Sequence, residues 1–298
     1  MRKKFASYLA VASLGAFAAC TTARTNGDVD HADHDTSVQA PAGNAPAIAS
    51  LPPDAEGARA RLASSPRHGE WVTVSAGADS VRAWIVYPER KTKAPVIVVV
   101  HEIYGLTPWV RAVADQLAAE GFIAIAPDLL TMKNLPNPTD SVPGALATAA
   151  IRTLDKADIQ RYLDVTARHA MALPSALRKY GIIGFCWGGN VAFEHAVHAP
   201  ALGASVVYYG PSPAPESLVS VRAPVLGLYG GSDARVGATV PPADSAMRAL
   251  KKTFTHYSYD GAGHGFLRQQ TAQSGANLDA ARQAWPATIA WFRRYLAP

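Results

Sequence analysis

Cysteine, charge and long apolar runs are all scarce in this chain. Only 17% of its 298 residues are charged and 49% are hydrophobic, a composition that suits a sizeable core and argues against a disordered chain. The formal net charge is +5, and Arg2, Lys3 and Lys4 supply +3 of it. The remaining +2, without a later basic run, gives no support to nucleic-acid binding.

The first 19 residues have the layout of a secretory signal peptide. Three basic residues precede residues 5–19, which are apolar and uncharged. This stretch is shorter than the roughly 20 residues of a transmembrane helix and fits the apolar centre of an export signal. A buried N-terminal helix is the less favoured alternative. We predict that residues 1–19 are a signal peptide and that the protein is exported.

Two processing sites compete at the end of this segment. Ala16-Phe17-Ala18 fits the small-x-small rule of ordinary signal peptidases, whereas Phe17-Ala18-Ala19-Cys20 resembles a bacterial lipobox with Phe where Leu is common. We favour the lipobox because Cys20 falls at the end of the apolar stretch. Lipidation of Cys20 would anchor the protein to a membrane, so we expect a periplasmic protein or a membrane-anchored lipoprotein.

The chain has only two cysteines, Cys20 and Cys186. Once Cys20 is lipidated or removed, the mature protein cannot form an internal disulfide. Exported proteins usually keep cysteines for disulfides, so a single remaining thiol is a candidate reactive group. Cys186 is therefore the first residue to consider for chemistry.

Residues 20–53 are predicted to be a flexible tether, because they are rich in small and polar residues and lack apolar periodicity. Six of these residues could be drawn as metal ligands, namely Asp28, Asp30, His31, Asp33, His34 and Asp35. A metal site needs rigid support, so we favour a solvated linker and expect no metal. We assign residues 54–298 to one domain without internal repeats.

Five continuous apolar runs predict strands that are buried on both faces. They are residues 95–100, 122–127, 181–186, 204–209 and 224–229. Apolar residues at helical spacing occupy 108–120, 153–172, 188–199, 242–252 and 278–295, and a further strand is expected at 254–259. A short helix near 54–63 and a hairpin of strands 71–76 and 81–88 precede them.

This order predicts an α/β fold, a mostly parallel sheet of about eight strands with helices on both faces and an N-terminal hairpin. Ligands of such sheets bind beyond the carboxyl ends of the strands. Glu102, Asp128, Cys186, Gly210 and Asp233 follow the apolar runs there. Residues 130–149, rich in Pro, Asn and Thr, are expected to form a loop or lid.

The segment from Gly184 to Gly189, Gly-Phe-Cys-Trp-Gly-Gly, has the layout of a nucleophile elbow with Cys186 where Ser is usual. The turn is so sharp that side chains at positions 184 and 188 would collide with neighbours. It would lift the sulfur to the top of the sheet and place it at a helix N-terminus, where the dipole favours a thiolate. A buried structural cysteine is the alternative.

Asp233 and His264 complete the chemistry that this elbow suggests. Asp233 follows a strand and a glycine turn, and His264 lies in a Gly-rich loop. The chain order of nucleophile, Asp and His is that of α/β-hydrolases. The backbone N–H groups of Trp187 and Ile103 are the candidate oxyanion hole. The other histidines are assigned no catalytic role, including His101, His195 and His198.

Together with the elbow, three segments resemble dienelactone hydrolases: His101-Glu102-Ile103-Tyr104-Gly105, Ala126-Pro127-Asp128-Leu129 and Gly263-His264-Gly265-Phe266. The resemblance covers roughly residues 70–296. It implies the α/β-hydrolase fold and hydrolysis of a small-molecule ester or lactone by a Cys-His-Asp triad without a cofactor. It also implies that Glu102 contacts the resting thiol and helps to deliver a thiolate once substrate binds.

The same resemblance implies substrate contacts. Arg268 is similar to the carboxylate-binding Arg near the catalytic His, and Tyr104 and Phe266 are expected to contact substrate. The second substrate Arg of the family has no clear counterpart, and Arg152 is the nearest candidate. We expect a monomer.

Two alternatives stay open. One is a carboxylesterase of broad specificity that needs no substrate carboxylate. The other is a binding or redox-sensing protein on the same fold, whose exported thiol would form a sulfenic acid. Asp233 and His264 argue against the second, because a binding protein has no need of them.

Overall fold

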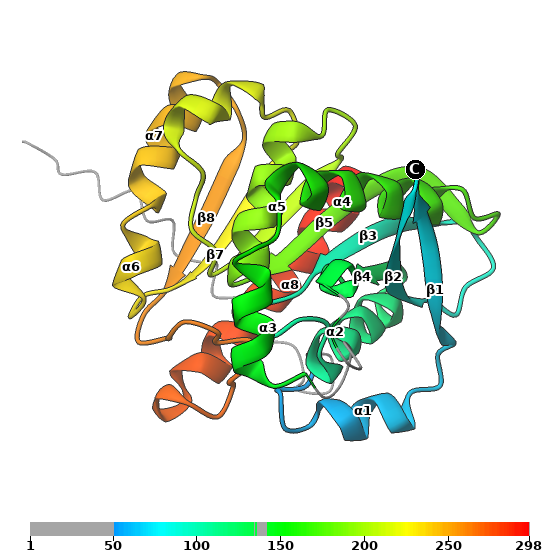
Figure 1. Ribbon diagram of the computed structural model, residues 1–298. Coiled ribbons are helices and arrows are strands. Elements are labelled where there is room, and N and C mark those ends of the chain that lie inside the picture. Colours follow the sequence, from blue (N-terminus) through cyan, green and yellow to red (C-terminus); the bar gives the residue numbers. More distant parts are fainter. Residues whose placement is uncertain (1–50, 134, 136–141, 298) are drawn as a thin grey trace, which may run out of the picture. The chain divides into compact units, whose positions relative to one another are not determined.

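The computed structural model of the protein describes residues 51–133, 135 and 142–297 (Figure 1). The predicted signal peptide, Cys20 and the tether up to residue 50 lie outside the described residues, as do residues 134 and 136–141 of the predicted loop. Within the described part of the chain, no helix is both long and apolar enough to span a membrane.

In this part of the chain, eight strands form one sheet with the order β1-β2-β4-β3-β5-β6-β7-β8. The first two pairings in this order are antiparallel, and the other five are parallel. This confirms the predicted mostly parallel sheet with its N-terminal hairpin. The strands are β1 (Gly69–Ala76), β2 (Asp79–Val86), β3 (Ala94–Val100), β4 (Ile123–Pro127), β5 (Ala176–Phe185), β6 (Ala204–Tyr208), β7 (Val225–Gly230) and β8 (Phe254–Tyr259).

Helices cover both faces of the sheet (Figure 1). Neighbouring residues of β3 alternate between two apolar clusters, with Ile97 in one and Val98 in the other, which explains the continuous apolar run. α1, α2 and α8 contribute to the first cluster, and α4, α5 and α7 to the second. The α-helices are α1 (Ala58–Ser64), α2 (Pro108–Ala119), α3 (Gly144–Ile151), α4 (Lys156–Met171), α5 (Trp187–His198), α6 (Ala234–Gly237), α7 (Val240–Ala249) and α8 (Ala276–Leu296).

Two predicted boundaries differ from the structure. The predicted loop over 130–149 contains a short 3₁₀ turn, η2 (Thr131–Lys133), and most of α3. The helix predicted from residue 153 begins at Lys156, because the side chain of Asp155 accepts the N–H groups of Ala157 and Asp158 at 2.8 and 3.1 Å. This N-cap fixes the start of α4. Two further 3₁₀ turns are η3 (Pro215–Ser220) and η4 (Gln273–Gly275).

The folded domain includes residues before the predicted boundary at 54. Leu51 is 2% exposed and packs in the first apolar cluster. The carbonyl of Pro52 accepts from Nε2 of Gln270 at 3.0 Å, and the N–H of Ala55 donates to the carbonyl of Arg268 at 2.9 Å. The segment from Leu51 to Ala55, here called the N-terminal arm, therefore holds the loop that follows His264.

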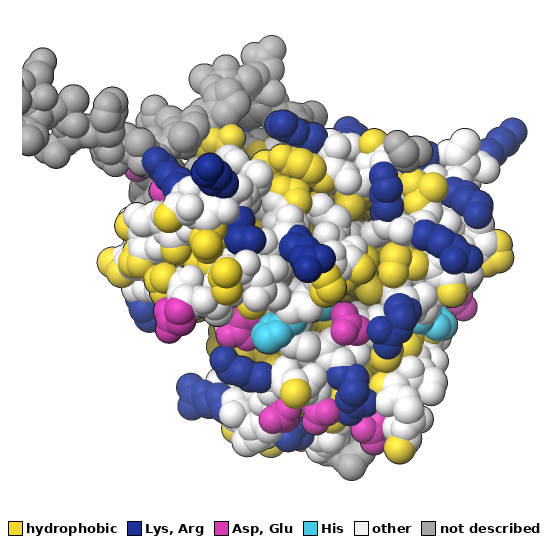
Figure 2. All heavy atoms as spheres, turned by 90° about the horizontal axis from the view of Figure 1, so that it is seen from above, with side chains coloured by type: hydrophobic (Ala, Val, Ile, Leu, Met, Phe, Trp, Pro, Cys, Tyr) yellow, Lys and Arg dark blue, Asp and Glu magenta, His cyan; other side chains and the backbone are white. Residues whose placement is uncertain are grey.

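The surface charges are mixed. On the face shown in Figure 2, Lys and Arg side chains are interspersed with apolar, uncharged and acidic ones. Several basic residues pair with acids, for example Arg293 with Glu120 at 3.0 Å and Arg161 with Asp158 at 2.8 Å. Exposed pairs of this kind contribute little to stability because water and salt screen them, so the apolar clusters dominate the stability of the domain.

Candidate active site

Cys186 lies in a sharp turn between β5 and α5, with φ 57° and ψ −117°. This conformation is rare for a residue with a side chain and is typical of a nucleophile elbow. The surrounding glycines permit it. A Cβ on Gly184 would lie 1.8 Å from the carbonyl oxygen of Gly188, and one on Gly188 would lie 2.3 Å from that of His101. The steric role predicted for both glycines is confirmed.

Asp233 and His264 are joined by a hydrogen bond of 2.5 Å between Oδ2 and Nδ1. The other oxygen of Asp233 accepts the N–H of Val236 at 3.3 Å in the first turn of α6, so both oxygens are engaged. The carboxylate therefore fixes the imidazole with its proton on Nδ1. Nε2 is then free to act as a base.

The thiol of Cys186 is neutral at rest. Burial raises its pKa to about 11, and the negative charge of Glu102 acts in the same direction. Hydrogen-bonding interactions with the backbone of Trp187 and Ile103 lower the pKa, as does the charge of Arg235. The sequence analysis expected the helix dipole to favour a thiolate. Burial outweighs that effect.

The two predicted oxyanion donors act on the same sulfur. The backbone N–H groups of Ile103 and Trp187 belong to different loops, one after β3 and one after β5, and both interact with the thiol. Among the described residues, no hydrogen bond joins this thiol to His264. The resting sulfur is thus held beside the donors and not by the base.

Glu102, Arg268 and Tyr104 form a linked group beside the thiol. Nε of Arg268 lies 3.2 Å from Oε2 of Glu102, and the guanidinium carbon lies 5.0 Å from the ring centroid of Tyr104. Burial raises the pKa of Glu102 to about 7, although Arg268 acts to lower it. The structure therefore brings together three residues that the resemblance had suggested, with Tyr104 the most exposed of them at 39%.

Phe266 lies in the core, in the loop that carries His264. Its side chain is fully buried, and its ring lies 5.3 Å from that of Tyr209 and 5.5 Å from that of Tyr259. Apolar packing covers the whole ring, and contact of Phe266 with substrate stays a prediction. Its role is to hold the loop that carries His264 against the core.

The second cation near the thiol is Arg235, not the candidate Arg152. Arg152 is exposed at the end of α3. Arg235 is an exposed residue of α6, two positions after Asp233, and its charge acts on Cys186. Arg235 lies two residues after Asp233 in the chain, and this proximity to a predicted catalytic carboxylate was the available signal for it.

His101 and Tyr209 are two buried side chains beside the site for which the sequence predicted no catalytic or binding role. The ring of Tyr209 lies 5.2 Å from the imidazole of His264. Its hydroxyl is buried without a hydrogen-bond partner among the described residues. Burial raises the pKa of Tyr209 well above its usual value, and the charges of Glu102 and Cys186 add to this. Tyr209 thus presents a neutral hydroxyl group to this part of the core.

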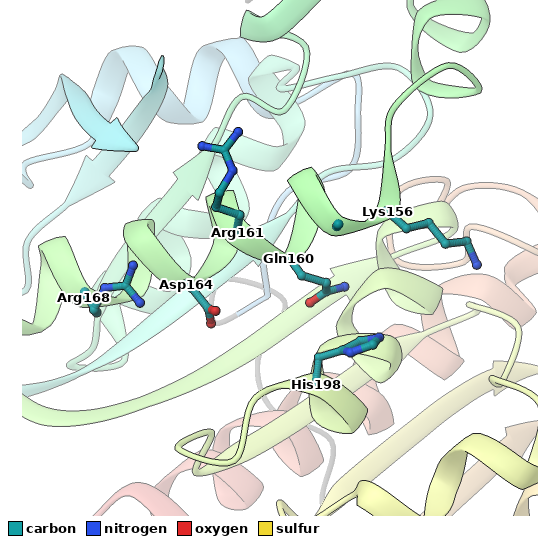
Figure 3. Close-up of a pocket in the computed structure, with 7 residues that line it drawn as sticks. Lys156, Gln160, Arg161, Asp164, Arg168 and His198 are labelled. Carbon is teal, nitrogen blue, oxygen red and sulfur yellow. The ribbon is translucent and has the colours of Figure 1, made fainter. Parts of the chain in front are cut away.

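A separate hollow of about 580 Å³ lies between α4 and the end of α5 (Figure 3). It contains none of Cys186, Asp233 and His264. It is lined by Lys156, Ala157, Gln160, Arg161, Asp164, Arg168 and His198. Beneath it, His195 is 1% exposed, with Nδ1 2.7 Å from Gln160 and Nε2 3.1 Å from the hydroxyl of Tyr180. This confirms the interpretation of His195 as a packing residue with its hydrogen bonds satisfied.

Comparison with known proteins agrees with this geometry. The model of the dienelactone hydrolase family matches residues 81–296. The chain belongs to this family. A Salmonella typhimurium protein assigned as a carboxymethylenebutenolidase is 32% identical over 272 residues, which cover 86% of this chain and 96% of that protein.

A solved structure supports the same assignment. A protein from Klebsiella pneumoniae, assigned as a dienelactone hydrolase, matches with a TM-score of 0.69 at 30% identity over 77% of this chain and 99% of its own. A Bradyrhizobium protein, assigned as a 2-oxo-3-(5-oxofuran-2-ylidene)propanoate lactonase, is 26% identical over 76% of this chain and 94% of its own length. The expected family and the α/β-hydrolase fold are thus confirmed, and the protein is a dienelactone hydrolase-like hydrolase.

Proposed function

We propose that this hydrolase cleaves an ester or lactone through a triad of Cys186, His264 and Asp233. The observation that carries the proposal is the 2.5 Å hydrogen bond between Asp233 and His264. Both residues lie beyond the carboxyl ends of the parallel strands β7 and β8, in the same sheet whose elbow holds the thiol. An oriented imidazole and a thiol on a nucleophile elbow are the parts that acyl transfer needs.

In the proposed reaction, the proton of the Cys186 thiol passes by way of Glu102 to His264, and the thiolate attacks the carbonyl carbon. The N–H groups of Ile103 and Trp187 bind the oxyanion that forms. Protonated His264 then gives its proton to the leaving alkoxide, which yields a thioester. Finally His264 takes a proton from water, the hydroxide attacks the thioester carbonyl, and the protonated imidazole returns its proton to the departing thiolate, which releases the acid and the thiol.

We further propose that the substrate carries a carboxylate. Arg268 is paired with Glu102 at rest, and a substrate carboxylate that competes for this guanidinium would release Glu102. A Glu102 carboxylate freed beside the thiol can accept its proton, and Arg235 would add attraction for the anion. The substrate named for the Bradyrhizobium relative is a lactone that bears a carboxylate, which supports the same substrate class here.

A carboxylesterase of broad specificity is the second candidate. Arg268 already has its charge balanced by Glu102, so a neutral ester would meet no uncompensated cation there. A redox-sensing role is less favoured, because a thiol with a pKa of about 11 is protonated at neutral pH, whereas redox sensors rely on an accessible thiolate. From the sequence alone, we also propose export and lipidation at Cys20.

The test compares the full chain with its Cys186→Ala variant on dienelactone, a neutral aryl acetate and a neutral lactone. Dienelactone turnover that disappears in the variant supports the triad and the anionic substrate. Turnover of the aryl acetate alone keeps the triad but moves the function to a general esterase. Hydrolysis that is unchanged in Cys186→Ala would overturn the proposal.

A further inference from the structure

His101 is the last residue before Glu102, and its imidazole is fully buried with both nitrogens engaged. Nε2 accepts the backbone N–H of Leu129 at 3.3 Å, and Nδ1 lies 2.8 Å from the carbonyl oxygen of Glu102. A backbone N–H can only donate, so Nε2 is the unprotonated nitrogen. The proton is therefore on Nδ1, which donates to Glu102.

The acceptor of this bond belongs to the peptide group that contains an oxyanion donor. The carbonyl of Glu102 and the N–H of Ile103 are the two edges of one planar trans peptide and point in opposite directions. A hydrogen bond that fixes the carbonyl edge therefore fixes the direction of the Ile103 N–H. This N–H is one of the two that interact with the sulfur of Cys186.

The same imidazole also contacts the second donor residue. The ring of His101 stacks on that of Trp187, with centroids 5.6 Å apart and an angle of 23° between the planes. The backbone of His101 is also closely packed against that of Gly188, because a Cβ on Gly188 would lie 2.3 Å from the carbonyl oxygen of His101. One side chain thus connects the loops after β3, β4 and β5.

Burial keeps this imidazole neutral, since it lowers the pKa of His101 to about 4. Neutrality matters for the hydrogen bonds, because an imidazolium would carry a proton on Nε2 and could not accept from Leu129. The arrangement is therefore retained throughout the neutral pH range, and it provides a fixed support that does not switch with pH.

We propose that His101 is a positioning residue of the oxyanion hole, which aligns the N–H of Ile103 through the Glu102 carbonyl and braces Trp187 by stacking. The inference rests on the proposed function. It goes further by naming a side chain that touches neither the substrate nor the reacting atoms. Its effect is confined to steps in which negative charge develops on the carbonyl oxygen.

The test uses phenyl acetate and its thionoester, in which sulfur replaces the carbonyl oxygen. Both substrates need the same thiolate, so their rate ratio is independent of the amount of folded enzyme and of the pKa of Cys186. Two aligned N–H donors suit an oxygen anion better than a larger sulfur anion. A loss of alignment therefore reduces the preference for the oxygen ester.

His101→Phe keeps a ring for the stack and removes both nitrogens, whereas His101→Asn keeps an N–H donor near the position of Nδ1. We expect His101→Phe to lower kcat for phenyl acetate by about tenfold to a hundredfold with KM little changed, and to reduce the oxygen-to-sulfur rate ratio. His101→Asn should retain most of kcat for phenyl acetate and most of the oxygen-to-sulfur rate ratio. His195→Phe is the matched control, because His195 is equally buried and doubly hydrogen-bonded away from the triad.

An unchanged rate ratio in His101→Phe, with an active wild type, would overturn the inference and leave the proposed function intact. A loss that is equal for both esters and matches that of His195→Phe would also overturn it, since that is damage to the fold. If wild type hydrolyses neither of these esters nor dienelactone, the proposed function fails and the inference fails with it. If His101→Phe does not fold, His101→Gln replaces it, because its longer amide does not place a donor at Nδ1.

Discussion

Arg268 and Glu102 form an ion pair, with Nε of the guanidinium 3.2 Å from Oε2 of the carboxylate, directly beside the resting thiol. The same carboxylate is therefore linked electrostatically to both the cation and the thiol. Arg268 lowers the pKa of Glu102, whereas Glu102 raises that of Cys186. Any ligand that engages Arg268 changes the balance at the nucleophile.

Replacement of Arg268 tests whether this pair recognises an anionic substrate. Arg268→Ala should lower kcat/KM for dienelactone by about tenfold to a hundredfold, because hydrogen bonds to charged groups contribute about 1.5–3 kcal/mol. Turnover of a neutral aryl acetate should change much less. Arg282→Ala is the control, since Arg282 pairs with Asp279 at 3.3 Å on α8. Equal losses on both substrates would contradict an anion site at Arg268.

Glu102→Gln should separate the reactivity of the thiol from turnover. Without the negative charge the pKa of Cys186 falls, so alkylation by iodoacetamide at a fixed pH near 8 should become faster, by less than about tenfold. Ester hydrolysis should become slower, because the group that accepts the thiol proton is lost. Parallel progress curves of alkylation and hydrolysis check both directions, and slower alkylation would contradict the electrostatic assignment.

The change of hydrolytic activity with pH tests the direction in which ionisation of Glu102 acts. Burial raises the pKa of Glu102 to about 7, so its carboxylate form increases as pH rises through that value. Activity that depends on this carboxylate should increase over the same range in wild type. The increase should be absent in Glu102→Gln, and a wild-type profile that is flat around pH 7 would exclude Glu102 from the activation step.

Asp233→Asn should leave the fold unchanged and remove most of the turnover. An amide cannot stabilise the imidazolium and can turn its N–H toward His264, which favours the wrong tautomer. The expected loss in kcat is on the order of 10⁴-fold, as in triads that lose their carboxylate. Asp279→Asn is the control because Asp279 is an exposed residue on α8. A loss below about tenfold would remove Asp233 from the triad.

The sequence predicted those parts of the fold that depend on local patterns. The apolar run from Val96 to Val100 identified β3, and the glycines around Cys186 identified the elbow, because both signals are steric or periodic over a few residues. The resting protonation of Cys186 was not predictable in this way. It depends on burial by distant segments and on the position of Glu102, and these arise only when the strands assemble.

The burial of Phe266 was not predictable for the same reason. A Phe two residues after a catalytic His can face either the substrate or the core, and only its neighbours in space decide between the two. In the structure it packs against Tyr209, which directly follows β6, and Tyr259, the last residue of β8. The packing of Leu51 in the first apolar cluster was not predictable either, because the N-terminal arm has no apolar periodicity and its position depends on the loop that it meets.

The N-terminal arm should contribute measurably to stability. Leu51→Ala removes a buried side chain, so the free energy of unfolding should fall by about 2–4 kcal/mol. Val219→Ala is the control, because Val219 is 61% exposed and should change the stability by less than about 0.5 kcal/mol. Urea unfolding of the full chain measures both. An unaffected Leu51→Ala variant would show that the arm is not held against the loop.

The elbow itself can be tested by a pair of glycine substitutions. In Gly184→Ala the new Cβ would meet the carbonyl oxygen of Gly188 at 1.8 Å, and a backbone oxygen cannot turn aside as a side chain does. We expect a loss of more than about 3 kcal/mol in stability, together with loss of turnover. Gly237→Ala has no atom within 4 Å of the new Cβ and lies in α6, so it should be neutral or stabilising by up to about 1 kcal/mol. Urea unfolding separates the two variants, and a stable, active Gly184→Ala enzyme would contradict the tight turn on which the position of the nucleophile depends.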